Sequence, residues 1–332
     1  MLENSCFSLL LTTHILYNIL IKDIEKMLLI DFFEKRRERM VGERIVEILK
    51  YVVSYDLPVI VVVLLAIWVG KLVNDLLTRY KIDEELTGKN NPAVGVALAG
   101  YYIGLAIAIA GVVIGPADST LTKDLLDIAI YSVMAIILMN VATFINDKLI
   151  LYKFDDQKEL INDQNSGTGA VMAGSYLATG FIINASVSGE LAGGWWKGLL
   201  ACLIFFILGQ VVLVITGIWY QIITKYDVHK AIGDNNNVAA GISFGGFLLS
   251  MGYIVSSAMT GESESWALDL ASFGLYVVIA LIILTLGQWI TDKVFLPKAK
   301  TSEEVGVQAN TAAAAISIAI NLSVAILVVH VL

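Results

Sequence analysis

Apolar runs of about 20 residues, separated by short polar segments, recur along most of the chain, and each is long enough to cross a lipid hydrocarbon core as an α-helix. The runs are apolar throughout and lack the inside/outside alternation of a membrane β-strand, which favours helices. We therefore predict an all-α integral membrane protein with eight transmembrane helices. The predicted spans lie near 57–79, 92–114, 124–146, 168–190, 196–220, 238–260, 267–290 and 309–331.

A frame of small residues that starts at an asparagine occurs four times, and each copy opens the second of two consecutive apolar spans. This pattern predicts four repeated helical hairpins joined by short charged loops. Small residues at four-residue spacing let helix backbones touch in lipid, so we expect the second helices at the centre and the first helices outside. The four marker asparagines are Asn91, Asn165, Asn237 and Asn310, and the packing glycines are Gly95, Gly100, Gly104, Gly169, Gly174, Gly241, Gly245 and Gly246.

The repeats divide the chain into an N-terminal extension, 1–50, and two four-helix membrane domains, 53–190 and 196–332. The apolar stretch 5–21 lacks the basic start and small-residue cleavage site of a signal peptide. We expect the extension to be an interfacial helix or not native, with the functional protein starting near Met40.

Charge along the loops predicts the orientation of the helices. The chain is 57% apolar and only 16% charged, against about a quarter charged in typical domains. The loops inside the hairpins hold twelve Lys and Arg, and those between hairpins hold two. Cytoplasmic loops carry the excess of basic residues, so we expect the four asparagine-bearing loops in the cytoplasm and the C-terminus outside. Eight basic residues within 22–50 oppose this bias unless translation starts at Met40.

Each marker asparagine lies just before a predicted helix, and Pro92 follows the first of them. Asparagine there caps free backbone N–H groups, and proline is preferred at the first helical position. The structural interpretation is therefore that all four are N-caps. The alternative is that four helix N-termini converge and attract an anion.

Other polar residues are candidates for a permeation pathway. The first helices leave the membrane at Asp75, Asp147 and Asp292, and the third copy has Gln221 there instead. A ring of acids is typical of a cation pathway mouth, whereas ordinary interfacial residues explain the same pattern. Inside the spans we single out Asn140, Thr216 and Thr285, which either line a polar path or join helices by hydrogen bonds.

The residues offer no reaction chemistry. Cys6 and Cys202 lie far apart, the three histidines are scattered, and no nucleophile–base pair or metal-ligand spacing is evident. We expect no catalytic residue, no metal and no cofactor, and no enzyme activity or nucleic-acid partner. No span holds a charge near its middle, as a proton-coupled pump usually requires.

The repeats resemble domain of unknown function 350, the YjfL-like family of bacterial and archaeal inner-membrane proteins. The resemblance is carried by Asn90-Asn91-Pro92-Ala93-Val94-Gly95 through Gly104 and by Asn236-Asn237-Val238-Ala239-Ala240-Gly241 through Ser250, with weaker motifs at 165–178 and 310–323. It implies two tandem family domains and a location in the cytoplasmic membrane. It implies no activity, because the family has none to carry over.

Two functions remain open at this point. The parallel repeat favours a channel or transporter for an ion or small solute, because such repeats occur in transporters. The alternative is a non-transporting membrane scaffold or stress-response subunit that acts through partners or lipids. The expected partners are the lipid bilayer and further copies of the same chain in a homo-oligomer.

Overall fold

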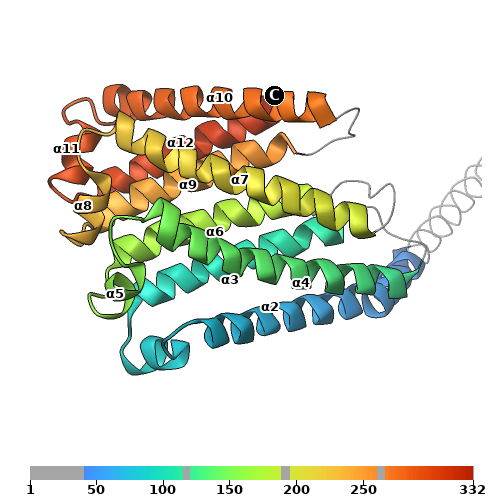
Figure 1. Ribbon diagram of the computed structural model, residues 1–332. Coiled ribbons are helices and arrows are strands. Elements are labelled where there is room, and N and C mark those ends of the chain that lie inside the picture. Colours follow the sequence, from blue (N-terminus) through green and yellow to red (C-terminus); the bar gives the residue numbers. More distant parts are fainter. Residues whose placement is uncertain (1–40, 115–119, 188–194, 260–265, 332) are drawn as a thin grey trace, which may run out of the picture. The chain divides into compact units, whose positions relative to one another are not determined.

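The computed structural model describes residues 41–114, 120–187, 195–259 and 266–331 (Figure 1). They belong to two compact units, one ending at Ile60 and the other beginning at Val61. The expectations about residues 5–21 and a start at Met40 concern residues outside this description.

The first unit is helical from Val41 onward. A π-helical turn, η1 (Val52–Asp56), leads into α2 (Leu57–Leu77) without a break. The rings of Tyr51 and Tyr55 stack with their centroids 5.2 Å apart. The helix is therefore continuous through residue 50, where the sequence indicated the end of an extension.

Eight helices of the described residues are long and apolar enough to cross a membrane. This confirms the predicted all-α class and the number of spans. After α2 come α3 (Pro92–Ile114), α4 (Leu121–Ile145) with η3 (Asn146–Ile150), α6 (Ser166–Val187), α7 (Trp195–Ile223), α9 (Val238–Ser257), α10 (Trp266–Ile290) with η4 (Thr291–Phe295), and α12 (Thr311–Val331).

The ends of the helices differ from the prediction where polar residues continue a helix. The third span runs from Leu121 to Ile150 and thus extends past 124–146 at both ends. The turn η3 keeps Asn146 and Asp147 helical, because a helix satisfies its own backbone groups whether its side chains are apolar or polar. Polar residues therefore do not mark where the helix ends.

Short helices occupy the segments that the sequence indicated as loops. They are η2 (Glu84–Gly88), α5 (Asp156–Ile161), α8 (Val228–Gly233) and α11 (Thr301–Gly306). The helices α5, α8 and α11 lie at the same end of the second unit (Figure 1). Each precedes a marker asparagine, so this end holds the polar contacts that join the repeats.

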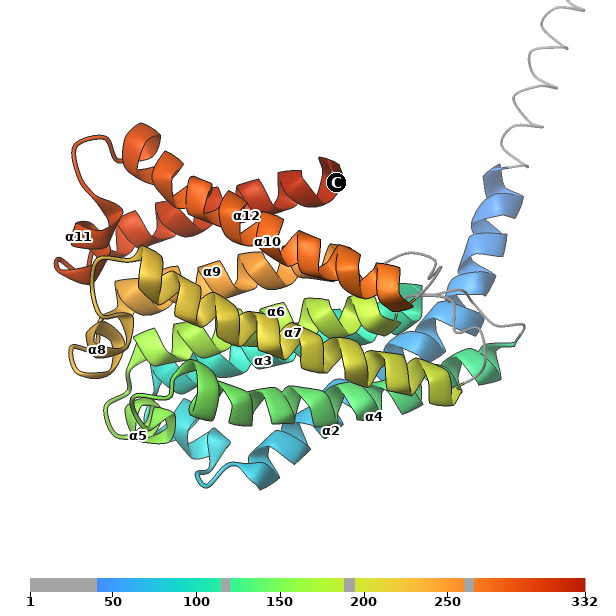
Figure 2. The ribbon, with the colours of Figure 1, turned by 45° about the horizontal axis from the view of Figure 1, so that its top comes forward.

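The helices α3, α6, α9 and α12 form a row, in which each packs against the next (Figure 2). All four begin at the end that holds the short helices, so they run parallel. Most residues of α6 and α9 are buried, whereas many of α12 are exposed. The first helices cover the row: α4 packs on α3 and α6, α7 on α6 and α9, and α10 on α9 and α12.

Glycine lets the backbones within this helix row touch. A Cβ added at Gly174 would overlap the carbonyl of Gly245, and one added at Gly241 would overlap the backbone of Gly167. Such close approach lets dispersion forces act along the helices in lipid, where no hydrophobic driving force is available. Gly100, Gly104, Gly169, Gly245 and Gly246 likewise lie against the neighbouring helix, whereas a Cβ at Gly95 would meet only the Leu86 side chain.

Candidate functional site at the helix caps

The four marker asparagines cap the helices of the row. Asn91 Oδ1 accepts the N–H groups of Ala93 and Val94 at 3.0 and 3.3 Å. The oxygens of the other three accept equivalent N–H groups: Asn165 from Gly167 and Thr168, Asn237 from Ala240, and Asn310 from Ala312 and Ala313. These bonds satisfy part of the positive helix end that an anion would otherwise meet.

The side-chain nitrogen of three of these asparagines reaches the next repeat. Each Nδ2 donates to a backbone carbonyl of the following short helix, always five residues before the next marker asparagine. We call this set of hydrogen bonds the relay. Its members are Asn91 to Leu160 at 2.7 Å, Asn165 to Ile232 at 2.7 Å and Asn237 to Val305 at 2.8 Å.

A glutamate in the short helix binds the same nitrogen in three repeats. Nδ2 of Asn91, Asn165 and Asn310 donates to Glu85, Glu159 and Glu304, at 3.0, 2.8 and 2.8 Å. Each glutamate lies six residues before its asparagine, and the third copy has Ala231 there. Despite its burial, hydrogen bonds from Lys89 and Asn91 hold the pKa of Glu85 below its usual range.

The residue before each marker asparagine has a left-handed backbone. The φ angles are 52° at Asn90, 46° at Gln164, 49° at Asn236 and 52° at Ala309. This turn brings the N–H of the marker asparagine back to the carbonyl six residues earlier, as in Asn165 to Glu159 at 2.8 Å. Asparagine adopts this conformation readily, whereas alanine and glutamine do so at a cost.

We call Asp75, Asp147 and Asp292 the exit acids; the first and the last of them accept a backbone N–H at the start of a short helix or two residues before it. Asp292 Oδ1 accepts the N–H of Thr301 at 2.8 Å, and Asp75 Oδ1 accepts that of Ile82 at 3.3 Å. In the third copy Gln221 Oε1 accepts the N–H of Val228 at 2.8 Å. An amide oxygen therefore replaces the absent acid, which assigns these residues a capping role that needs no negative charge.

The second copy places two acids together instead. Asp147 lies beside Asp156, the buried first residue of α5, and pairs with Lys148. Burial, followed by the hydrogen bond and charge of Asp147, raises the pKa of Asp156 to about 8. The raised pKa favours the protonated form of the Asp156 carboxyl at neutral pH, with Asp147 as its neighbour.

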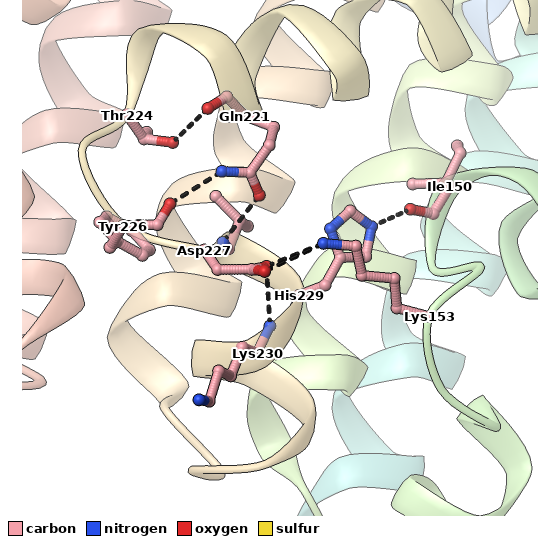
Figure 3. Close-up of polar contacts among 9 residues, drawn as sticks. Ile150, Lys153, Gln221, Thr224, Tyr226, Asp227, His229 and Lys230 are labelled. Atoms are coloured by element: carbon pink, nitrogen blue, oxygen red, sulfur yellow. Dashed lines mark hydrogen bonds and ion pairs between the residues drawn. The ribbon is translucent and has the colours of Figure 1, made fainter.

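A buried histidine joins the second and third repeats (Figure 3). The ring nitrogen Nε2 of His229 lies 2.8 Å from the carbonyl oxygen of Ile150, and Lys153 pairs with Asp227 at 3.0 Å. The ring packs against Tyr152, 4.8 Å between centroids. Burial lowers the pKa of His229 below its usual range, so the neutral ring donates from Nε2.

The polar residues inside the spans bind different neighbours. Asn140 Nδ2 donates to the hydroxyl of Tyr101 at 2.9 Å, Thr216 donates to the carbonyl of Val212 at 2.7 Å, and Thr285 accepts from Trp219 at 3.0 Å. The structure thus places Asn140, Thr216 and Thr285 in separate contacts between or within helices. The candidates that it does bring together are the marker asparagines, through the relay.

An apolar groove lies between α4 and α7. It has a volume of 320 Å³ and is lined by apolar side chains of α4, η3 and α7 together with Gln210. The Gln210 amide nitrogen donates to Thr179 at 2.9 Å. Neither the marker asparagines nor Asn140, Thr216 or Thr285 contribute to its lining.

Sequence reasoning missed several residues of this site. The glutamates six residues before the marker asparagines form a regular spacing that three repeats share. Gln221 was identified only as a departure from the acid pattern. His229 had no detectable signal, because its partner Ile150 is 79 residues away and contributes only its backbone.

These features define an integral membrane protein with eight membrane helices among the described residues, whose parallel central helices are joined through asparagine caps. Residues 51–187 and 194–332 each match the family described as Domain of Unknown Function (DUF350), and the chain belongs to this family. It is 26% identical over 248 residues to a UPF0719 transmembrane protein of Aquifex aeolicus (strain VF5), covering 72% of this chain and 87% of the relative. No solved structure matches the chain. The family description assigns no activity.

Proposed function

We propose that the protein is a non-transporting membrane scaffold, a rigid lateral row of helices that organises partners or lipids. The observation that carries this proposal is the backbone contact along the row, for example between Gly174 and Gly245. Helices packed at this distance leave no space between them for a permeating solute. The relay fixes the same helices at their capped ends.

The polar groups support the same function. Asn140, Thr216 and Thr285 form hydrogen bonds with other groups of the protein. Polar residues join helices in lipid through such bonds. The groove between α4 and α7 is apolar, so its surface suits an acyl chain better than a hydrated ion. Every one of these contacts stabilises the assembly of helices.

The test is a pair of measurements on the full chain. Purified protein in liposomes is assayed for ion and small-solute flux across a broad panel, and cross-linked cells are analysed by mass spectrometry. A scaffold gives flux equal to that of empty liposomes together with reproducible cross-linked partners. Protein-dependent flux, or recovery of the chain with neither partner nor second copy, contradicts the proposal.

A channel or transporter is the second candidate, and one observation favours it. Asn321 in α12 is buried, and both polar atoms of its side chain lack a hydrogen-bond partner in the described structure. Unsatisfied polar groups at membrane depth often mark a pathway. If the protein conducts, Asn321→Leu should reduce the flux, whereas Leu275→Val on the lipid-exposed surface should leave it unchanged.

The proposed function is not catalytic, and its location is the cytoplasmic membrane. The domains are proposed as 53–190 and 196–332, in line with the two family matches. We also propose that α5, α8 and α11 lie in the cytoplasm and the C-terminus outside, from the excess of Lys and Arg. In a variant without native cysteines, Lys158→Cys should resist an impermeant thiol reagent in whole cells and Val331→Cys should react; the reverse labelling refutes this orientation.

A further inference from the structure

We infer that the chain binds further copies of itself head to tail, with α12 of one copy against α3 of the next, so that the helix row continues across the contact. A second copy would be the lateral partner of the proposed scaffold, so the biological role of the contact rests on the proposed function. The contact itself would repeat the interface between neighbouring repeats, which occurs three times within the chain.

The first repeated element of that interface is a backbone contact. The small residue nine positions after each marker asparagine lies against the residue eight positions after the next one. Gly100 lies against Ala173, Gly174 against Gly245, and Gly246 against Ile318. In a continued row the same register places Ala319 of one copy against Ala99 of the next.

The second repeated element is the relay. Asn91, Asn165 and Asn237 each donate to the carbonyl five residues before the next marker asparagine. Asn310 caps its own helix in the same way, but among the described residues its nitrogen has only Glu304 as a partner. The carbonyl five residues before Asn91 belongs to Leu86, and none of the relay asparagines among the described residues donates to it. In the contact between two copies, Asn310 Nδ2 of one copy donates to the Leu86 carbonyl of the next.

The two end faces have the composition of the faces that are buried inside the row. Ala319 and Ser323 of α12 are exposed, as is Ala99 of α3. Small residues offer little side chain to lipid but allow close backbone approach. The exposed faces of α12 and α3 are therefore suited to close packing against another helix.

The packing of the first helix of each hairpin also indicates a further helix beside α3. The helices α4, α7 and α10 each lie along the boundary between two helices of the row. By the same rule, α2 belongs on the boundary between α3 and a helix that precedes it. The described residues of the second unit contain no such helix, and Leu64, Trp68 and Leu76 of α2 are 60, 58 and 83% exposed. The α12 helix of another copy supplies that boundary.

Membrane orientation allows this arrangement. The four helices of the row run parallel, so a copy added at the end keeps the same side toward the cytoplasm. Head-to-tail contacts are heterologous and do not close unless the rotation returns to the start. The assembly therefore grows as a ladder of dimers, trimers and longer rows.

Disulfide cross-linking in native membranes tests the contact. In a variant with Cys6 and Cys202 replaced by serine, Ala99→Cys and Ala319→Cys are combined in one chain and oxidised. We expect a ladder of multimers that reductant collapses, and no dimer from either single cysteine. The control pair is Val133→Cys with Leu275→Cys, on lipid-exposed surfaces of α4 and α10. Absence of the ladder, an equal ladder from the control pair, or dimers of Ala319→Cys alone overturns the inference.

A second measurement separates assembly from folding and from function. Dimerisation of purified protein in lipid is measured for Asn310→Ser, which keeps a capping oxygen but cannot reach a second copy. We expect association about threefold to tenfold weaker, the size of one interhelical hydrogen bond, while the monomer still folds and loses only the stability that the bond to Glu304 supplies. Ala319→Trp should abolish association, and Leu275→Trp should not. Unchanged association in both Asn310→Ser and Ala319→Trp refutes the contact, whereas flux from an intact ladder refutes only the scaffold function.

Discussion

The Nδ2 atom of Asn165 donates to the carbonyl oxygen of Ile232 at 2.7 Å, across 67 residues of sequence. The same side chain caps its own helix through Oδ1, so one amide closes a repeat and joins it to the next. The acceptor is a backbone atom, and the repeats therefore differ at that position, with Leu160, Ile232 and Val305. Only a side chain with both a donor and an acceptor performs both tasks.

Removing an asparagine inside the relay should therefore cost more than removing the last one. Asn165→Ala loses the cap, worth about 1 kcal/mol, and leaves the buried Ile232 carbonyl and Glu159 without a donor, which costs about 1–3 kcal/mol more. Asn310→Ala loses the cap and a half-buried bond to Glu304, for about 1 kcal/mol. The two variants are compared by unfolding in mixed micelles that keep the protein monomeric.

The intermediate variant Asn165→Ser restores the cap oxygen without the donor. Its stability should lie between those of wild type and Asn165→Ala. Equal losses in Asn165→Ala and Asn310→Ala would show that the relay contributes nothing to the stability of the monomer.

The membrane helices could be predicted because lipid leaves few alternatives. A long apolar run must satisfy its backbone groups internally, which makes it a helix. The start of α3 at Pro92 was predicted correctly because proline is preferred at the first helical position. The repeating small residues indicated close packing, yet only coordinates show which face of each helix meets which neighbour.

The site was much less predictable, for two physical reasons. The short helices are six residues or fewer and are stabilised by caps and tertiary contacts. Their sequences are therefore too short to show a helical periodicity. The relay and the His229 contact end on backbone carbonyls, which leave no trace in the identity of the acceptor residue. The exit acids were interpreted through their charge, whereas Gln221 in the third copy performs the same contact as a neutral acceptor.

Relieving the left-handed backbone at Ala309 should stabilise the protein. The φ of 52° at this alanine costs an L-residue about 1–2 kcal/mol, and glycine adopts it freely. Ala309→Gly should therefore raise the free energy of unfolding by about 1 kcal/mol. The matched control is Asn90→Gly at the same position of the first repeat, where asparagine already tolerates the turn. A destabilised Ala309→Gly would contradict the assignment of strain.

His229 should make stability fall in mild acid. Burial lowers its pKa in the folded protein, whereas the unfolded chain titrates near about 6.5. The unfolded state then binds more protons below that pH, so stability rises with pH up to about 6.5 and is lost as pH falls below it. His229→Gln keeps an N–H for the Ile150 carbonyl and does not titrate. The difference in melting temperature between the two proteins, measured from pH 5 to 8, should change as pH falls below about 7 and stay level above it; a difference that is constant over the whole range would exclude a titrating His229.

Asp156 should produce the opposite slope. Its pKa is about 8 in the folded protein and about 3.9 in the unfolded chain. The folded state therefore binds more protons between these values, so its stabilising effect is full below about pH 4 and is lost as pH rises to about 8. Asp156→Asn mimics the protonated acid and should be more stable than wild type at pH 8. Lower stability of Asp156→Asn at pH 8, or an unchanged slope, would show that Asp156 is ionised throughout.

Alanine substitutions at Gly174 and Gly274 should change stability in opposite directions. A Cβ at Gly174 would overlap the backbone of Gly245, whereas one at Gly274 on α10 meets nothing within 4 Å. Gly174→Ala must therefore push α6 and α9 apart, at a cost of about 1–3 kcal/mol or more. Gly274→Ala removes a flexible residue from a helix interior and should stabilise by up to about 1 kcal/mol. Expression level and melting temperature in detergent report both changes. Equal behaviour of the two alanine variants would mean that the backbones of the helix row are not in contact, which would remove the main support for a closed scaffold.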